Sequence, residues 1–405
     1  MPFDIARLLP AIEDLASYYA SEVVPNLRTC SEAAWKWLRE TPQERLDRAS
    51  REPALRILAT PLEDPGQALA APPPPPGYRV LASDGSSVDV DPHFPARYVL
   101  LHIALAGLAY TPPAYWTEHI PRLFFRQEEL ELTFPGSEEP VEVEGPVVAT
   151  LRAYEELRAL REGVAQALQN PDDRPLLAMM DAVILWTHHG SGPGHDALRE
   201  DYLRHSVKLV EEFRKEGVPL VSFTSMPHHR EVVNTLLALV CPKERKLACT
   251  DCQEPRRECL FLQVGAHGRA PLQDRHLFSF LKEGERSALF RPVYRGNTAW
   301  RLPQGVQSDP ELAFFYLNTG PGIARCELPL WIAQAGRLPA VHAIVFDQCR
   351  PQRAEVAGYP LALTLAHREA VLTARDRQFL QWMVEEALAR RGLYLPPSPK
   401  AEMKE

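Results

Sequence analysis

The spacing of hydrophobic positions changes near residue 78, from a helical repeat to short continuous apolar runs. Before that point, apolar residues recur every three or four positions, which predicts helices over residues 1–70. A proline run at Pro72–Pro76 predicts a stiff spacer after these helices. The positions that carry the helical repeat include Ile5, Leu8, Leu9, Ile12, Leu15 and Tyr18.

Beyond the spacer, short apolar runs predict strands, and longer amphipathic stretches at Val147–Leu168 and Asp196–Glu216 predict helices between them. This interleaving predicts an α/β fold, a mixed sheet with helical cover. A Glu- and Pro-rich segment, Phe125–Glu144, predicts a hairpin or exposed arm, and the polar tail Leu395–Glu405 predicts disorder. The predicted strands are Tyr78–Ala82, Tyr98–Ala104, Leu176–Trp186, Val218–Ser222, Leu312–Leu317 and Val341–Phe346.

The net charge of the chain bears on whether it binds nucleic acid without sequence preference. The 405 residues include 45 Lys and Arg against 53 Asp and Glu, a net charge of −8. Proteins that coat nucleic acid without sequence preference are usually basic, so this balance argues against that class but allows a local basic channel. The start of the chain lacks the pattern of a signal peptide, and no apolar run is long enough to cross a bilayer. We therefore expect a cytoplasmic protein with no membrane association.

One motif joins an apolar strand to a carboxylate and a tight turn: Val80-Leu81-Ala82-Ser83-Asp84-Gly85-Ser86-Ser87. A strand can carry Asp84 out of the core, and a Gly-Ser turn can leave its carboxylate open to a divalent cation. Taken alone, Asp-Gly is also a common turn dipeptide, so a solvated turn is the simpler reading.

Further carboxylates occur where a metal site would need them. Asp181 interrupts an apolar run, and a buried carboxylate is costly unless it is paired or bound to a metal. The preceding helix carries Glu155 and Glu156, either of which can lean over the strand ends. For a generic helix, a solvated glutamate is the simpler reading.

A C-terminal segment adds an imidazole and a phenol. His367 follows an apolar helical turn, and Tyr359 lies eight residues earlier. By itself such a histidine is more often a surface or cap residue. Together with Asp84, Asp181 and a helix glutamate, it would suit Mg²⁺ or Mn²⁺, with the imidazole favouring Mn²⁺. Two such ions promote phosphodiester hydrolysis by activating water and stabilising the leaving oxygen.

Four of the seven cysteines lie within 19 residues, in the pattern Cys241-x7-Cys249-x2-Cys252-x6-Cys259. Four thiolates at this spacing predict a structural Zn²⁺ site, with an iron–sulfur cluster or four unrelated thiols as alternatives. Four thiolates leave no open coordination position, so we expect a structural rather than a catalytic role.

These segments, in this order, resemble the NurA family of DNA repair nucleases over about residues 78–380. Together with the helical repeat, the spacer and the polar tail, this predicts three parts of the chain: a helical N-terminal extension at 1–76, a NurA-like nuclease domain at 77–394 with a Cys-rich insertion at 241–259, and a disordered tail at 395–405. The matching pieces are Ala82–Ser86, Glu156–Arg158, the strand ending at Asp181, Val221–Ser225, Val232–Asn234, Asp274–Phe278, Gly284–Phe290, Phe315–Tyr316, Arg325–Pro329, Tyr359–Pro360 and Ala366–His367.

The resemblance also implies an RNase H-like α/β core, a homodimer, and Mn²⁺-dependent exonuclease and endonuclease activity on DNA. It further implies a part in DNA end resection and double-strand break repair beside a hexameric HerA-type translocase. Carried over by position, Asp84, Glu156 and Asp181 are implied metal ligands. His367 is implied as a fourth ligand or a phosphate contact, and Tyr359 as an active-site partner.

One departure from the family pattern leaves an alternative open. Family members commonly follow the second aspartate with Gly-Ser, whereas this chain has Asp181-Ala182-Val183. The carboxylate is kept, but the turn that would free it is changed. The alternative is a catalytically degenerate dimeric subunit that docks on DNA ends or on a translocase without cutting.

Overall fold

The computed structural model forms two compact units, one of residues 1–71, 224–301 and 312–327, the other of residues 72–223, 302–311 and 328–405. We name them unit 1 and unit 2. The structure describes residues 5–94, 96–135, 139–170, 172–181, 183–185, 190–242, 244, 246, 247, 249, 252, 259, 272–293 and 311–393. The predicted tail at 395–405 lies outside the described residues.

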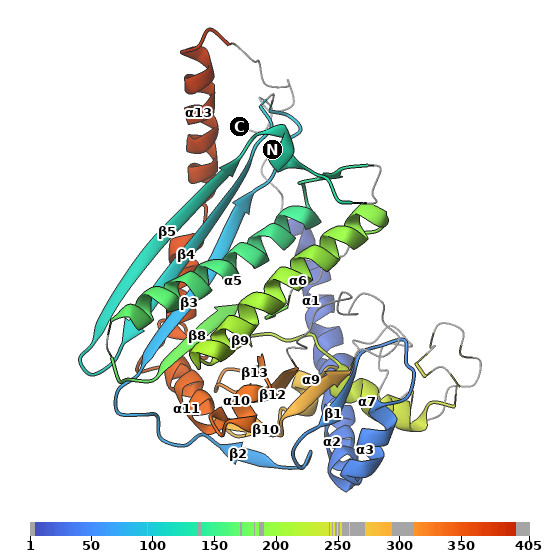
Figure 1. Cartoon of the computed structure of the whole chain (residues 1–405). Coiled ribbons are helices and arrows are strands. Elements are labelled where there is room, and N and C mark those ends of the chain that lie inside the picture. The colour runs from blue at the N-terminus through green and yellow to red at the C-terminus, as the bar shows by residue number, and fades with distance from the viewer. Residues whose placement is uncertain are drawn as a thin grey trace. The chain divides into compact units, whose positions relative to one another are not determined.

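Unit 1 opens with a long helical stretch and continues into strands (Figure 1). Its strands follow the order β1-β11-β12-β13, and β10 pairs with both β12 and β2. Buried side chains from α2, α3, α7 and these strands form its core. Its elements are η1 (Ile5–Leu8), α1 (Leu9–Tyr18), η2 (Tyr19–Val23), α2 (Val24–Glu40), α3 (Gln43–Ser50), β1 (Leu58–Pro61), β2 (Ala68–Ala70), α7 (Glu231–Val240), α9 (Asp274–Leu277), β10 (Glu285–Ser287), β11 (Phe290–Val293), β12 (Leu312–Asn318) and β13 (Ile323–Pro329).

Unit 2 is a mixed sheet covered by helices, with strand order β9-β8-β3-β4-β5. Strands β9, β8 and β3 run parallel, while β4 and β5 are antiparallel to their neighbours. Its elements are β3 (Arg79–Val88), β4 (Val99–Ala109), β5 (Ala114–Phe124), α4 (Gln127–Leu130), β6 (Glu131–Leu132), β7 (Val141–Glu142), α5 (Pro146–Gln169), β8 (Leu176–Asp181), α6 (Pro193–Glu216), β9 (Leu220–Thr224), α10 (Trp331–Gln334), α11 (Leu338–Cys349), α12 (Leu361–Ala370) and α13 (Ala374–Ala389).

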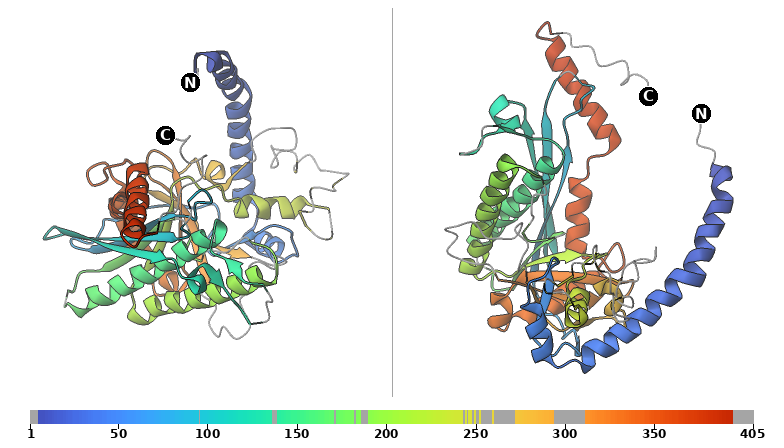
Figure 2. Two further views of the ribbon diagram at one scale, coloured as in Figure 1. Left: turned by 90° about the horizontal axis from the view of Figure 1, so that it is seen from above. Right: turned by 90° about the vertical axis from the view of Figure 1, so that its right-hand side faces the viewer.

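Helices cover both faces of the unit 2 sheet. Helix α5 packs on β3, β4 and β8 with α6 outside it, and α12 packs on β3, β4, β5 and β8. In the right-hand view of Figure 2, the green helices α5 and α6 lie on one side of the strands and the orange-red C-terminal helices on the other. We name these two sides the α5 face and the α12 face.

The predicted mixed α/β fold is confirmed, with local signals that set the helix boundaries. Helices α5 and α6, predicted at 147–168 and 196–216, both begin at a proline, where a missing backbone N–H costs nothing. Helix α6 ends at Gly217, whose φ of +68° is the left-handed conformation that glycine adopts freely at a helix end. The Glu- and Pro-rich arm contains a short helix and the β6–β7 hairpin.

Two predictions of element type were wrong. Val341–Phe346, predicted as a strand, lies within helix α11, whose residues from Val341 to Cys349 are all buried. A helix buried on every side shows a continuous apolar run, which periodicity cannot tell from a buried strand. Residues 1–70 are not helical throughout, because β1 and β2 follow α3. The predicted strands at Leu176–Trp186 and Val218–Ser222 are present as β8, which ends at Asp181, and β9.

No described helix combines the length and the apolar character needed to cross a membrane.

Candidate functional site

The parallel pairing of β3 with β8 brings Asp84 and Asp181 together. The last paired residues of these two strands are Ser83 and Met180. Asp84 and Asp181 are the next residue on each strand. Because side chains alternate between faces along a strand, these two leave the sheet on the same face, at the point where β8 ends and β3 continues beside β4.

The third carboxylate, Glu156, approaches the same place from helix α5. An ideal Cβ built on Gly85 would lie 2.7 Å from the Glu156 Oε1 atom, so any side chain at position 85 would collide with this carboxylate. Gly85 therefore leaves the space that the Glu156 carboxylate occupies, and a side chain at position 85 would force Glu156 to move. The predicted Gly-Ser turn is instead an extended continuation of β3, which runs to Val88.

Burial controls the charge of Glu156. The residue is 8% exposed. Burial, together with the neighbouring charges of Asp84 and Asp181, raises the pKa of Glu156 from 4.5 to about 8, while the charge of Arg152 opposes this shift. The Arg152 Nε atom lies 3.4 Å from Glu156 Oε1. Three carboxylates thus lie near one another, and the charged form of Glu156 is the one that burial disfavours.

An imidazole and a phenol contact the two aspartates. His367 of α12 lies with its Nδ1 atom 2.6 Å from Asp84 Oδ2, and the Gly85 backbone N–H donates to Asp84 Oδ1 at 2.8 Å. Tyr359 is hydrogen-bonded to Asp181. Burial, followed by the Asp181 and Asp84 charges, raises the pKa of the Tyr359 phenol well above its usual range. All five residues singled out from the sequence therefore lie in one region of unit 2.

The chemistry of these donors fits a hard divalent cation, although the present geometry is not that of a closed ligand shell. Among the described residues, no three His, Cys, Asp or Glu side chains are grouped closely enough to hold an ion as they stand. Instead Asp84 faces His367, Asp181 faces Tyr359 and Glu156 faces Arg152. A buried carboxylate with a raised pKa beside two further carboxylates is a set that a divalent cation would stabilise.

A protein-family model described as the NurA domain matches residues 78–372, nearly three quarters of the chain. The chain belongs to the NurA family. The match contains all five residues described above. No functionally curated protein matches this NurA family member in sequence.

Solved NurA structures match most of the chain at low sequence identity. The NurA nuclease from Sulfolobus solfataricus has 10% identity and a TM-score of 0.48, and the match covers 97% of this chain and 98% of that one. A NurA structure with manganese has 11% identity, a TM-score of 0.42 and coverages of 91% and 96%. A NurA structure bound to dAMP and manganese has 10% identity, a TM-score of 0.40 and coverages of 79% and 89%.

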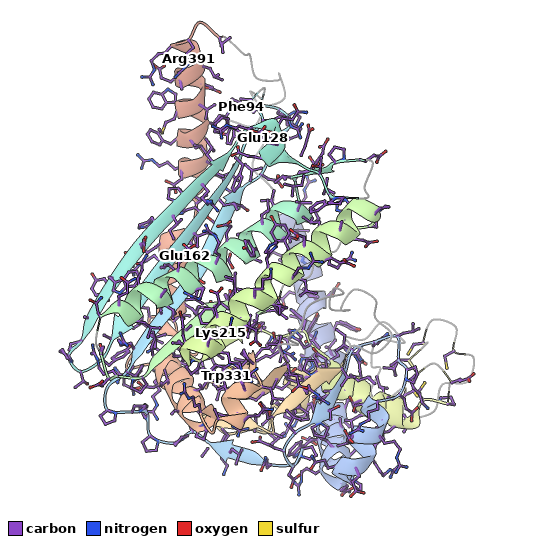
Figure 3. All side chains as sticks on the ribbon, viewed as in Figure 1. Phe94, Glu128, Glu162, Lys215, Trp331 and Arg391 are labelled. Atoms are coloured by element: carbon purple, nitrogen blue, oxygen red, sulfur yellow. The ribbon has the colours of Figure 1, made fainter. Side chains whose placement is uncertain are left out.

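The structure separates the two adjacent glutamates that the sequence of this NurA family member left undecided. Glu155 Oε1 accepts from Arg122 of β5 at 2.6 Å, and Glu155 Oε2 accepts from Arg158 at 2.6 Å. Arg158 also pairs with Glu162, which Figure 3 labels on α5. Glu155 therefore ties α5 to the sheet, while Glu156 faces Gly85.

Sequence reasoning missed two kinds of residue in this region. Arg152 lies four positions before Glu156, a spacing that places the two on one helix face, and this signal was available in the sequence. Ser86, His102 and His119 contact α12 or one another beside the site. They come from three strands, so no sequence spacing relates them.

The four clustered cysteines of this NurA family member lie in unit 1. Cys259 is buried, and Cys241 and Cys249 pack against the same core. The Leu247 N–H lies 3.4 Å from Cys241 Sγ. Within the described residues, no three cysteines are grouped as a metal site requires. The Zn²⁺ site stays a prediction.

Proposed function

We propose that this NurA family member is a Mn²⁺-dependent DNA nuclease that hydrolyses phosphodiester bonds at the unit 2 site. One observation carries the proposal: Asp84 and Asp181 follow the last paired residues of two parallel strands, with Glu156 held against Gly85 beside them. Because the chain belongs to the NurA family, we assign these carboxylates to phosphodiester hydrolysis. Mn²⁺ is also the ion named for two of the solved NurA structures.

Each residue has a role in this proposal that follows from its position. Asp84, Glu156, Asp181 and His367 would hold the metal ions, which when bound would activate water and stabilise the leaving oxygen. Tyr359, hydrogen-bonded to Asp181, orients that carboxylate and keeps its own proton because its pKa is raised. Gly85 gives Asp84 a fixed orientation through its backbone N–H and leaves space for Glu156.

The biological setting is proposed from the family alone. We propose that the protein acts as a homodimer in DNA end resection and double-strand break repair, beside a HerA-type hexameric translocase. The sequence shows no phosphate-binding loop of the Gly-Lys-Ser/Thr type, so ATP use would belong to the partner.

The proposal is tested by incubating the protein with end-labelled single- and double-stranded DNA in Mn²⁺, Mg²⁺ or EDTA, beside Asp84→Ala. We expect Mn²⁺-dependent degradation that Asp84→Ala abolishes, because this change removes one acid of the set. Glu162→Gln, on the outer surface of α5, is the matched control and should cleave as the wild type does. Full Mn²⁺-dependent activity in Asp84→Ala would refute the site.

The degenerate docking subunit remains the second candidate, favoured by Ala182-Val183 after Asp181 and by each carboxylate having its own partner. It predicts no cleavage by the wild type in any metal, even with the cognate translocase present. It also predicts that DNA or translocase binding survives in Asp84→Ala.

A further inference from the structure

Two side chains of the sheet contact the same carbonyl oxygen in the last turn of helix α12. Ala370 is the final residue of α12, and the last carbonyls of a helix have no partner inside the helix. The Ser86 hydroxyl donates to the Ala370 oxygen at 2.5 Å, and His102 Nδ1 lies 3.0 Å from the same oxygen. Ser86 and His102 are direct cross-strand partners on β3 and β4, so both reach α12 from one position of the sheet.

A second histidine extends this attachment and returns it to α12. His102 Nε2 lies 3.2 Å from His119 Nδ1, and the two rings are parallel, with centroids 5.4 Å apart and an interplanar angle of 5°. His119 Nε2 lies 3.4 Å from Glu369 Oε2, one residue before Ala370. The path from Ala370 through both imidazoles to Glu369 is therefore a closed loop between α12 and two strands.

The hydrogen-bond roles in this loop follow from the oxygens at its two ends. A carbonyl oxygen only accepts, so His102 carries a proton on Nδ1. The Glu369 carboxylate also only accepts, so His119 carries a proton on Nε2, and one further proton lies between His102 Nε2 and His119 Nδ1. Each ring thereby has one orientation, and the loop holds the last turn of α12 in place against the sheet.

This attachment lies one helical turn from the proposed metal site. His367 precedes Ala370 by three residues, and Ser86 follows Asp84 by two on the same face of β3. The same strand and helix therefore meet twice, at Asp84–His367 and at Ser86–Ala370. A rotation or slide of α12 that broke one contact would break the other.

We propose that His102 and His119 are positioning residues, which hold the last turn of α12 in register so that His367 meets Asp84. This inference rests on the proposed function, because its consequence is Mn²⁺ affinity. Partners that orient a metal ligand typically contribute about 10- to 100-fold to affinity. The competing role is direct contact with the DNA backbone, since His119 is about half exposed.

The test compares His102→Ala with His102→Asn, because an asparagine amide can donate to Ala370 from nearly the position of Nδ1. The first readout is amide hydrogen exchange of α12 in EDTA, which needs neither metal nor activity. We expect faster exchange at the end of α12 in His102→Ala and wild-type exchange in His102→Asn. His205→Ala, a partly exposed histidine on α6, is the control and should change nothing.

The second readout is Mn²⁺ affinity measured calorimetrically without DNA. We expect affinity about tenfold or more weaker in His102→Ala, and recovery in His102→Asn. Wild-type exchange and affinity in His102→Ala would overturn the inference. So would weaker DNA binding in EDTA with unchanged Mn²⁺ affinity, which would assign the pair to DNA. A wild type that binds no Mn²⁺ refutes the proposed function instead, and the exchange result then decides the positioning role alone.

Discussion

Each unit contains three carboxylates in a small space, and the two groups are neutralised differently. In unit 1, Glu231, Asp274 and Glu327 are 6%, 0% and 5% exposed. Arg325 Nη1 lies 3.3 Å from Glu231, and its Nη2 lies 3.2 Å from Glu327. Asp274 accepts from two backbone N–H groups at the start of α7 and from the Tyr316 hydroxyl.

In unit 2, the basic side chains beside Asp84 and Glu156 are more exposed than Arg325 is in unit 1. Arg152 is part-exposed and lies 3.4 Å from Glu156, and His367 is a largely exposed imidazole. Buried charge is tolerated when it is paired and hydrogen-bonded, as in unit 1. The comparison teaches that acid clusters are distinguished by what neutralises them, and that the unit 2 cluster suits a cation from solution.

The largest expected effect is the loss of the internal cation in unit 1. Arg325→Met leaves Glu231 and Glu327 buried without their shared partner, and breaking such a pair costs about 3–5 kcal/mol. The free energy of unfolding, measured in urea, should fall by that amount. Arg28→Met, at an exposed ion pair of the same unit, should change it by less than about 0.5 kcal/mol. A loss below about 1 kcal/mol in Arg325→Met would remove the contrast between the units.

Removing a negative charge from the unit 2 cluster is expected to stabilise the protein rather than destabilise it. Above its pKa of about 8, Glu156 is a buried carboxylate beside two others. Glu156→Gln should therefore stabilise the protein in EDTA at such pH, by about 1–2 kcal/mol. Mn²⁺ at a hundredfold excess over its Kd should stabilise the wild type by about 2.7 kcal/mol and the variant far less. Urea unfolding with and without Mn²⁺ measures both; equal Mn²⁺ protection of the two proteins would contradict the role of Glu156.

The third expected effect is a dependence of the free energy of unfolding on pH, caused by a group in unit 1. Burial and the Glu231 charge raise the pKa of Asp274 from 3.8 to about 6. The folded state then favours the protonated acid, so this contribution to stability is complete below about 3.8 and is lost as pH rises to about 6. The Asp274→Asn variant has no acid at this position. The wild type should therefore lose stability relative to this variant as the pH rises from 3.8 to about 6. Urea unfolding at several pH values checks this; a constant difference would show that Asp274 keeps an ordinary pKa.

Local sequence signals were enough to predict most of the unit 2 framework. The apolar runs before Asp84 and Asp181 predicted β3 and β8, and the amphipathic stretches predicted α5 and α6. Strand β5 was missed because its side chains are largely exposed, with residues such as His119 and Arg122 in place of an apolar run. Helix α11 was misread because complete burial erases helical periodicity.

The site was predictable as a set of residue types but not as an arrangement. Two adjacent glutamates on one helix carry the same local signal, and only the contacts with Arg122 and Gly85 distinguish them. The register that aligns Asp84 with Asp181, and Ser86 with His102, depends on strand pairing between distant segments. No spacing along a single sequence encodes such pairings.

Gly85 has no side chain, so Glu156 can approach the sheet there from the α5 face. This affects the stage of folding at which the set of donor side chains is complete. Glu156 arrives with the helices on the α5 face, whereas His367 arrives with the helix on the α12 face. The strands alone present two aspartates without the other donors. A newly made chain would thus acquire its complete set of donor side chains only after helices have docked on both faces of the sheet.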